Sequence, residues 1–181
     1  GSGKVLFEFR STATPIEFKN KDIDICINEI DNALVDELGS EVPYEILCSN
    51  EFFAKIVNKA KTSGSFENNT AGYIEEDGVR VLVADGKKFI PYRASYKDEN
   101  GSTKKFLKAN EAIVIPKSEK VYEVVYGRAD HTEAVKVAPK MFFAATPQEL
   151  ERGKGYAIDT EMKAMPYCTR PSALINLVFS N

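Results

Sequence analysis

The first long pattern of apolar residues along the chain is that of an amphipathic helix between Lys21 and Leu38. Apolar residues recur there at spacings of three and four, which places them on one face of a helix. The members of this stripe are Ile23, Ile27, Ile30, Leu34 and Leu38. Gly39 follows directly, where a left-handed C-terminal cap belongs. The pattern therefore predicts a helix that ends at Leu38.

A second helix is predicted to begin at Ser49 or Asn50. Either side chain can accept a hydrogen bond from the first turn, and Glu51 in that turn complements the positive helix end. Its apolar stripe comprises Phe52, Phe53, Ile56, Val57 and Ala60. A polar stretch at 62–72 follows and is expected to be a loop. Both predicted helices thus lie in the first third of the chain.

Most of the remaining chain has the alternating pattern of short strands. The expected strands are 4–10, 14–19, 44–48, two within 73–83, 121–127, 134–138, 156–166 and 173–179. Asp77-Gly78 predicts a tight turn inside 73–83. Residues 146–155 are expected to form a loop or a single helical turn that starts at Thr146 and Pro147. Helices gathered early and strands elsewhere define an α+β protein, not a repeated βαβ unit.

Residues 78–116 hold the most informative pattern. They read as a strand, a long two-stranded ribbon that turns at Asn100-Gly101, and an apolar strand that ends at Pro116. Tyr92 and Tyr96 share one face of the ribbon at period-two spacing. Charged residues surround them: Arg93, Lys97, Asp98, Glu99, Lys104, Lys105 and Lys108. Such a ribbon either packs its tyrosines on its own sheet or presents them, with the turn, to a neighbouring subunit.

Composition narrows the classes of partner. The chain has 181 residues, a formal net charge of −3 and a pI near 5.4, which argues against sequence-independent nucleic-acid binding. No apolar run approaches the roughly 20 residues that span a bilayer, and no leader pattern opens the chain. Cys26, Cys48 and Cys168 lie far apart, so each is interpreted as a reduced, buried residue.

Candidate chemistry is sparse. His131 is the single histidine, and a base built from it with Asp130 or Glu133 would use sequence neighbours in a turn. Asp22 and Asp24 read as helix-start charges, and Gly153-Lys154-Gly155 lacks the spacing of a phosphate-binding loop. Asp98 and Glu99, at a hairpin tip, have nothing to separate their pKa values. We therefore expect no catalytic residue, no metal site and no cofactor.

Several segments, taken in order, resemble the lambda-type tailed-phage major capsid protein family. The first is Tyr96–Gly101 with Lys104–Leu107, followed by the strand Ala112–Pro116. Tyr126–Ala129 resembles the short Tyr-Gly stretch of that family, and Pro139–Pro166 with Arg170-Pro171 resembles its C-terminal part. The early helix, strand and helix follow the order of the family, so the resemblance covers most of the chain.

The resemblance implies the Hong Kong phage capsid fold in a truncated form. The N-terminal arm, extended loop and spine helix of the family would precede the matched region. It implies one capsid-type unit, with an α+β axial lobe at about 20–75 and 110–145 and a β-rich peripheral part at 1–19, 76–109 and 146–181. The C-terminal strands are expected to return to the first strands.

The function that the resemblance implies is structural: a non-enzymatic subunit of a phage or prophage icosahedral head that self-assembles to enclose DNA. The expected partners are other copies of itself and scaffold or decoration proteins, without membrane or sequence-specific nucleic acid. The expected location is the virion, after assembly in the bacterial cytoplasm. Tyr92, Tyr96, Asn100 and Gly101 are the expected subunit contacts. The alternatives are a decoration, head-completion or tail module, and a small-molecule-binding or enzymatic domain.

Overall fold

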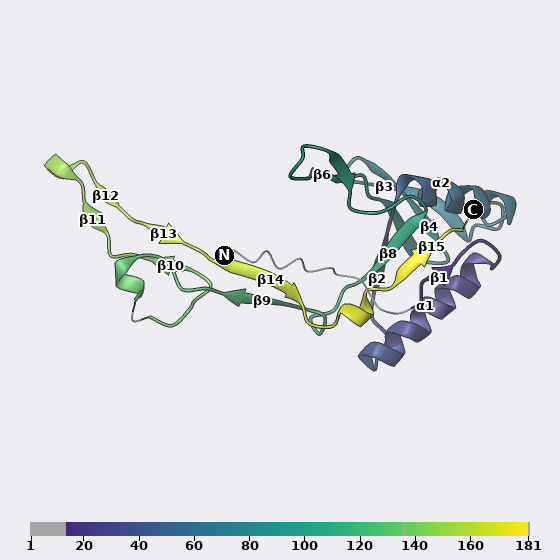
Figure 1. Ribbon diagram of the computed structural model, residues 1–181, viewed down its shortest axis with the longest axis horizontal. Coiled ribbons are helices and arrows are strands. Elements are labelled where there is room, and N and C mark those ends of the chain that lie inside the picture. The colour runs from purple at the N-terminus through teal and green to yellow at the C-terminus, as the bar shows by residue number, and fades with distance from the viewer. Residues whose placement is uncertain (1–13, 136, 181) are drawn as a thin grey trace. The chain divides into compact units, whose positions relative to one another are not determined.

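The computed structural model describes residues 14–135 and 137–180. These residues form two compact units. Unit 1 comprises the described residues of Gly1–Val121 and Arg170–Asn181, and unit 2 is Tyr122–Thr169. Both predicted helices lie in unit 1, and unit 2 is built from short strands and two short 3-10 turns (Figure 1). The class is α+β, as the pattern predicts.

The first predicted helix is confirmed as α1 (Ile23–Leu38). Its buried residues are Ile23, Cys26, Ile27, Ile30, Leu34 and Leu38, which includes the whole apolar stripe expected from the sequence. Gly39 adopts φ 73° and donates its N–H to the carbonyl of Val35 at 2.7 Å. That left-handed conformation is open to glycine at little steric cost, so Gly39 ends the helix as predicted.

The second predicted helix is confirmed as α2 (Asn50–Thr62). The Oγ of Ser49 accepts the backbone N–H of Phe52 at 3.2 Å, which identifies Ser49 as the N-cap. Phe52, Ile56 and Ala60 are buried, whereas Phe53 and Val57 at the border of the stripe are only partly covered. A narrow stripe is buried because α2 covers the sheet with one face only.

A mixed seven-stranded sheet forms the centre of unit 1, in the order β1-β15-β8-β2-β5-β4-β3. Its strands are β1 (Ile16–Glu17), β2 (Tyr44–Cys48), β3 (Ala71–Glu76), β4 (Val79–Ala84), β5 (Lys87–Pro91), β8 (Glu111–Pro116) and β15 (Asn176–Val178). Strand β2 pairs with β5 in parallel and with β8 in antiparallel register. Turns at Asp77-Gly78 and Asp85-Gly86 have positive φ at both residues, which suits two-residue hairpins.

Both helices pack on the same face of this sheet. Lys87 and Phe89 are two residues apart on β5 and therefore point to one side. The Nζ of Lys87 pairs with Asp31 of α1, whereas Phe89 lies edge-on to Phe18, which in turn contacts Phe52 of α2. The buried aromatic cluster Phe18, Phe52, Phe89 and Phe179 forms the core beneath α2.

The end of the chain returns to its first described strand, as expected. The short turn η3 (Pro171–Ala173) leads into β15, which pairs in parallel with β1 and in antiparallel register with β8. The backbone N–H of Ser180 donates to a carboxylate oxygen of Glu17 at 3.0 Å. The strand expected at 14–19 is thus shorter, at Ile16–Glu17. The strand expected at 4–10 lies outside the described residues.

The long ribbon expected within 78–116 is wrong in extent. Strand β5 belongs to the central sheet, where its parallel pairing with β2 extends to the N–H of Tyr92, which donates to the carbonyl of Cys48. Only β6 (Ser95–Lys97) and β7 (Thr103–Lys105) form a separate hairpin. Residues 92–94, which connect β5 to β6, are not strand, so Tyr92 and Tyr96 do not belong to one continuous ribbon.

Unit 2 consists of three nested antiparallel pairs, which make an irregular two-stranded ribbon with its tip near η2 (Figure 1). The pairs are β9 (Tyr122–Tyr126) with β14 (Ala164–Cys168), β10 (Phe143–Ala144) with β13 (Thr160–Glu161), and β11 (Gln148–Glu149) with β12 (Tyr156–Ala157). The 3-10 turns are η1 (Thr132–Ala134) and η2 (Glu151–Gly153).

Two predictions for unit 2 need correction. The strand expected at 134–138 is wrong, because the described residues of that range carry the end of η1 and irregular chain. The side chain of His131 accepts the N–H of Glu133, and the guanidinium of Arg128 donates to the carbonyl of Val135; such local bonds compete with a strand ladder. In 146–155 the helical turn begins at Glu151, not at Thr146, and β11 precedes it.

The boundaries of the compact units also differ from the division expected from the resemblance. Residues 79–91 were grouped with the C-terminal part, but β4 and β5 are strands of the central sheet beside β2. Residues 122–145, grouped with the helices, belong to unit 2. The reason is the pairing of β9 with β14, which joins segments about forty residues apart and could not be deduced from local pattern.

Candidate assembly surfaces

The turn of the β6–β7 hairpin is organised by Asp98. Its carboxylate accepts the N–H groups of Asn100 and Ser102 at 3.0 and 2.9 Å and pairs with Lys104 at 3.0 Å. The Lys104 ammonium, together with these N–H donors, holds the pKa of Asp98 below its usual value. Gly101 alone has positive φ, at 77°, and donates its N–H to the carbonyl of Asp98. The turn is therefore a glycine-bulge loop, not a two-residue Asn-Gly turn.

An aromatic cluster lies exposed beside this turn. The ring of Phe106 is 5.0 Å from that of Tyr96 and 6.3 Å from that of Tyr92, measured between centroids. The exposed fractions are 38% for Tyr92, 45% for Tyr96 and 60% for Phe106. We call Tyr92, Tyr96 and Phe106 the aromatic cluster. Its members touch one another and also face solvent, and their contact with a neighbouring subunit stays a prediction.

The hairpin is attached to the start of α2. The Nε of Arg93 donates to Asn50 Oδ1 at 3.1 Å, and Lys105 Nζ lies 3.3 Å from Glu51 Oε1. Sequence reasoning placed Tyr92, Tyr96, Asn100 and Gly101 in the ribbon but did not single out Phe106 as a contact residue. The pairing register of β6 with β7 identifies Phe106 as a neighbour of Tyr96. Tyr96 pairs with Lys104, and Phe106 is its diagonal neighbour on the same face.

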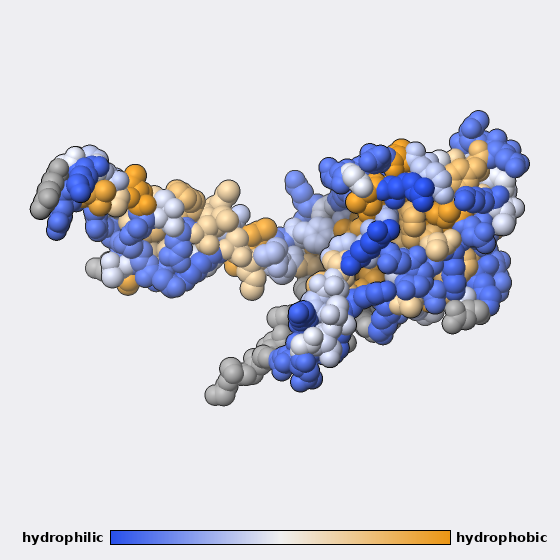
Figure 2. Space-filling model, turned by 90° about the horizontal axis from the view of Figure 1, so that it is seen from above, coloured by the Kyte–Doolittle hydropathy of each residue, from blue (hydrophilic) through white to orange (hydrophobic). Residues whose placement is uncertain are grey.

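Unit 2 has almost no core of its own. Among its described residues only Ala134 and Ala145 are buried. Its large apolar side chains are instead exposed by 39–69%: Tyr122, Val124, Val125, Val135, Met141, Phe142, Leu150, Tyr156, Ile158, Met162 and Met165. Figure 2 shows apolar residues in orange at the surface of this unit. Exposed apolar surface on this scale is typical of a protein-protein interface.

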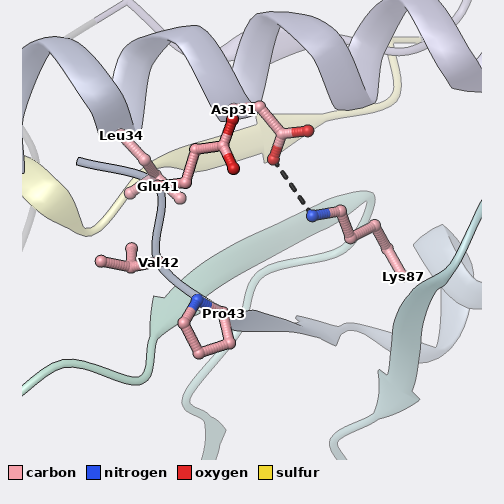
Figure 3. A pocket seen from close by; sticks show the side chains of 6 residues that line it. All are labelled: Asp31, Leu34, Glu41, Val42, Pro43 and Lys87. Atoms are coloured by element: carbon pink, nitrogen blue, oxygen red, sulfur yellow. Dashed lines mark hydrogen bonds and ion pairs between the residues drawn. The ribbon is translucent and has the colours of Figure 1, made fainter.

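A pocket of about 430 Å³ opens between α1, the segment 41–43 and β5. It is lined by Asp31, Leu34, Glu41, Val42, Pro43 and Lys87 (Figure 3). The Nζ of Lys87 lies 3.2 Å from Asp31 Oδ1 and 4.2 Å from the centroid of the Tyr44 ring. Burial, with the nearby Asp31 carboxylate, raises the pKa of Tyr44. Sequence reasoning missed this pocket because its lining comes from three separate segments.

The residues that the sequence raised as candidates for catalysis or metal binding take part in local contacts or are buried. The Nδ1 of His131 accepts the N–H of Glu133, and its ring lies 5.6 Å from that of Phe143. Asp130 is paired with Lys163. Burial raises the pKa of Cys26 to about 11 and raises that of Cys48 well above its usual range. Within 14–135 and 137–180, no group of three His, Cys, Asp or Glu residues could hold a metal ion.

Neither α1 nor α2, the helices of the described part of the chain, is long and apolar enough to cross a bilayer.

Comparison with known proteins identifies the family. Residues 19–179 match the sequence profile of the phage major capsid protein E family. This match covers most of the chain, including every strand of the central sheet except β1. The chain belongs to the phage major capsid protein E family.

Two individual relatives were compared. The major capsid protein of Salmonella phage Felix O1 is 22% identical over 202 residues, which cover 87% of this chain and 52% of that protein. A crystal structure described as a candidate capsid protein of a prophage of E. coli CFT073 is 14% identical, with a TM-score of 0.44, over 90% of this chain and 48% of that one. The chain thus spans about half the length of these relatives.

Proposed function

We propose that this chain is part of a structural subunit of a phage or prophage icosahedral head, which assembles with copies of itself to enclose DNA. The observation that carries the proposal is the match of residues 19–179 to the phage major capsid protein E family. In this proposal the subunit acts through contacts with other subunits and not through chemistry. Its location is the virion, after assembly in the host cytoplasm.

The fold proposed for the whole subunit is the Hong Kong phage capsid fold. Unit 1, with its mixed sheet and two helices, corresponds to the axial lobe, and unit 2 corresponds to the β-rich peripheral part. The proposed boundary between the axial lobe and the peripheral part is the boundary between the two compact units. An N-terminal arm, an extended loop and a spine helix would lie in the part of the relatives that this chain does not span.

The exposed apolar side chains of unit 2 support an assembled state. A free ribbon with only two buried residues leaves side chains such as Phe142, Met162 and Met165 in water, at 56%, 61% and 64% exposure. Removing apolar surface from water contributes about 25 cal/mol per Å². Coverage by other subunits therefore stabilises unit 2 in a way that its own chain does not.

The hairpin is proposed as a second contact between subunits, through Tyr92, Tyr96, Asn100 and Gly101. Aromatic side chains are enriched at protein interfaces, and the turn is exposed around them. The proposed partners are other copies, with scaffold or decoration proteins as further ones. No membrane or sequence-specific nucleic acid is included, since the net charge of −3 does not favour tight DNA binding.

Expression of the full-length protein, alone and with its scaffold, tests the proposal. Closed shells in negative-stain electron microscopy, which sediment as large particles, are the expected result. Monomers under every condition would contradict it. A small stable ring or trimer would instead favour a decoration, head-completion or tail role.

A further inference from the structure

The pocket and the hairpin lie at opposite ends of the parallel strands β2 and β5. Pro43 precedes β2 and Lys87 opens β5, so the pocket is at the start of both strands. Asn50 and Arg93, which connect the hairpin to α2, follow the ends of the same strands. About 13 Å of strand separates the two sites. One copy therefore cannot place its own hairpin on its own pocket, whereas a neighbouring copy can.

The pocket has an apolar floor and a rim with surplus negative charge. Leu34, Val42 and Pro43 provide the floor, and the Asp31 carboxylate is paired with Lys87. Asp24, Glu41 and Asp85 are exposed, and none of them has an ion-pair partner within the described part of the chain. The carboxylate of Asp24 helps to raise the pKa of Asp85, after partial burial, so these two like charges are close. Glu41 lines the pocket, and Asp85 lies two residues before Lys87, which also lines it, so a cation that approaches this side would meet surplus negative charge.

The hairpin carries a surplus of positive charge, which complements the negative charge near the pocket. Residues 92–108 carry five basic and two acidic side chains, a surplus of three positive charges. Lys104 and Lys105 are engaged with Asp98 and Glu51. Lys97 and Lys108 are exposed and make no ion pair among the residues that the structure describes. Lys97 follows Tyr96 directly and Lys108 follows Phe106 by two residues, so the hairpin combines exposed aromatic rings with positive charge that the described residues leave unpaired.

We propose that the hairpin of one copy docks on the pocket of the next copy. Phe106, the most exposed member of the aromatic cluster, packs on Leu34, Val42 and Pro43, and Lys97 and Lys108 approach the acidic rim. The volume of about 430 Å³ accommodates a side chain of this size. Because two different surfaces meet, the contact is heterologous, and repetition closes a ring of subunits. The inference rests on the proposed function, in which copies of this chain share one shell.

Charge exchange in the full-length protein tests the contact. Glu41→Lys alone, and Lys97→Glu with Lys108→Glu, are each expected to reduce the yield of shells about tenfold through like-charge juxtaposition. Combining all three changes is expected to restore the yield to within about threefold. Glu67→Lys and Lys61→Glu are matched controls on exposed residues that line neither the pocket nor the hairpin, and they should leave the yield unchanged.

Disulfide trapping gives a readout that does not depend on yield. Glu41→Cys and Lys108→Cys are both on exposed residues and leave Phe106 in place, so neither change should disturb the fold. They are placed together in a Cys168→Ser chain, in which the remaining Cys26 and Cys48 are buried. Oxidised shells should then give a ladder of covalently linked subunits, and either cysteine alone should not.

The outcomes separate the two proposals. If the unchanged protein forms no shells, the proposed function fails and this contact fails with it. If shells form normally, while charge reversal leaves their yield unchanged and trapping gives no ladder, the contact alone is wrong.

Discussion

Replacing Phe52 by alanine is expected to cost unit 1 a large part of its stability. Phe52 is fully buried at the start of α2 and lies edge-on to two other rings. Its centroid is 5.5 Å from that of Phe18 and 5.7 Å from that of Phe179. These rings belong to the first and last described parts of the chain, so the cavity would loosen the junction between α2, β1 and β15.

The magnitude follows from the burial. Truncation of a buried phenylalanine to alanine lowers the free energy of unfolding by about 3–5 kcal/mol, as the sum of lost transfer energy and cavity formation. The lost edge-on ring contacts are part of this sum and not an addition to it. Since domains of this kind unfold with about 5–15 kcal/mol, the variant should lose roughly a fifth or more of its stability.

Urea denaturation followed by circular dichroism at the helix band measures the effect. The chain has no tryptophan, and α1 and α2 both lie in unit 1, so the helix signal reports that unit. Phe142→Ala is the matched control: the same chemical change at a side chain that is 56% exposed in unit 2 should alter the value by at most about 0.5 kcal/mol. A loss below about 1 kcal/mol for Phe52→Ala would refute the described core.

Three further outcomes are expected. Ser49→Ala should lower the free energy of unfolding by about 1 kcal/mol because the cap of α2 is lost, and Ser49→Thr, which keeps the capping hydroxyl, should recover most of it in the same denaturation assay. The lowered pKa of Asp98 means that its carboxylate stabilises the hairpin fully above the ordinary pKa of 3.8 and loses this contribution as the pH falls below that value. Amide chemical shifts of the turn, followed by NMR from pH 6 to 2, should therefore move only below about pH 3.8. Unchanged shifts would contradict the role of Asp98 in organising the turn. Iodoacetamide should modify Cys168 in the folded chain and spare Cys48, whose burial raises its thiol pKa, until urea exposes it; mass spectrometry distinguishes the two.

The parts of the fold that depend on local physics were predictable. The stripe of α1, its cap at Gly39 and the cap of α2 at Ser49 are each determined within about one turn of helix. The hairpin at Asp77-Gly78 follows from the positive φ that these residues tolerate. The return of β15 to β1 was expected only through the family resemblance.

The failures share a cause, which is competition from long-range partners. The ribbon within 78–116 is broken because β5 pairs with β2, which is far away in sequence, up to the N–H of Tyr92. The pairing within unit 2 could not be predicted because its short pairs, such as β9 with β14, depend on register between distant segments. Exposed apolar residues there resemble core residues in the sequence, since alternation does not tell whether the chain itself or a neighbour covers them.

The central claim, that other subunits cover the apolar surface of unit 2, is tested most directly by methionine oxidation. All three methionines of the chain, Met141, Met162 and Met165, lie in unit 2 and are exposed by 61–65%. Peroxide treatment of the unassembled protein should oxidise all three readily. In assembled shells, mass spectrometry should show slower oxidation of Met162 and Met165 by about tenfold or more, because burial limits access. Equal oxidation rates in shells and in the unassembled protein would contradict the account.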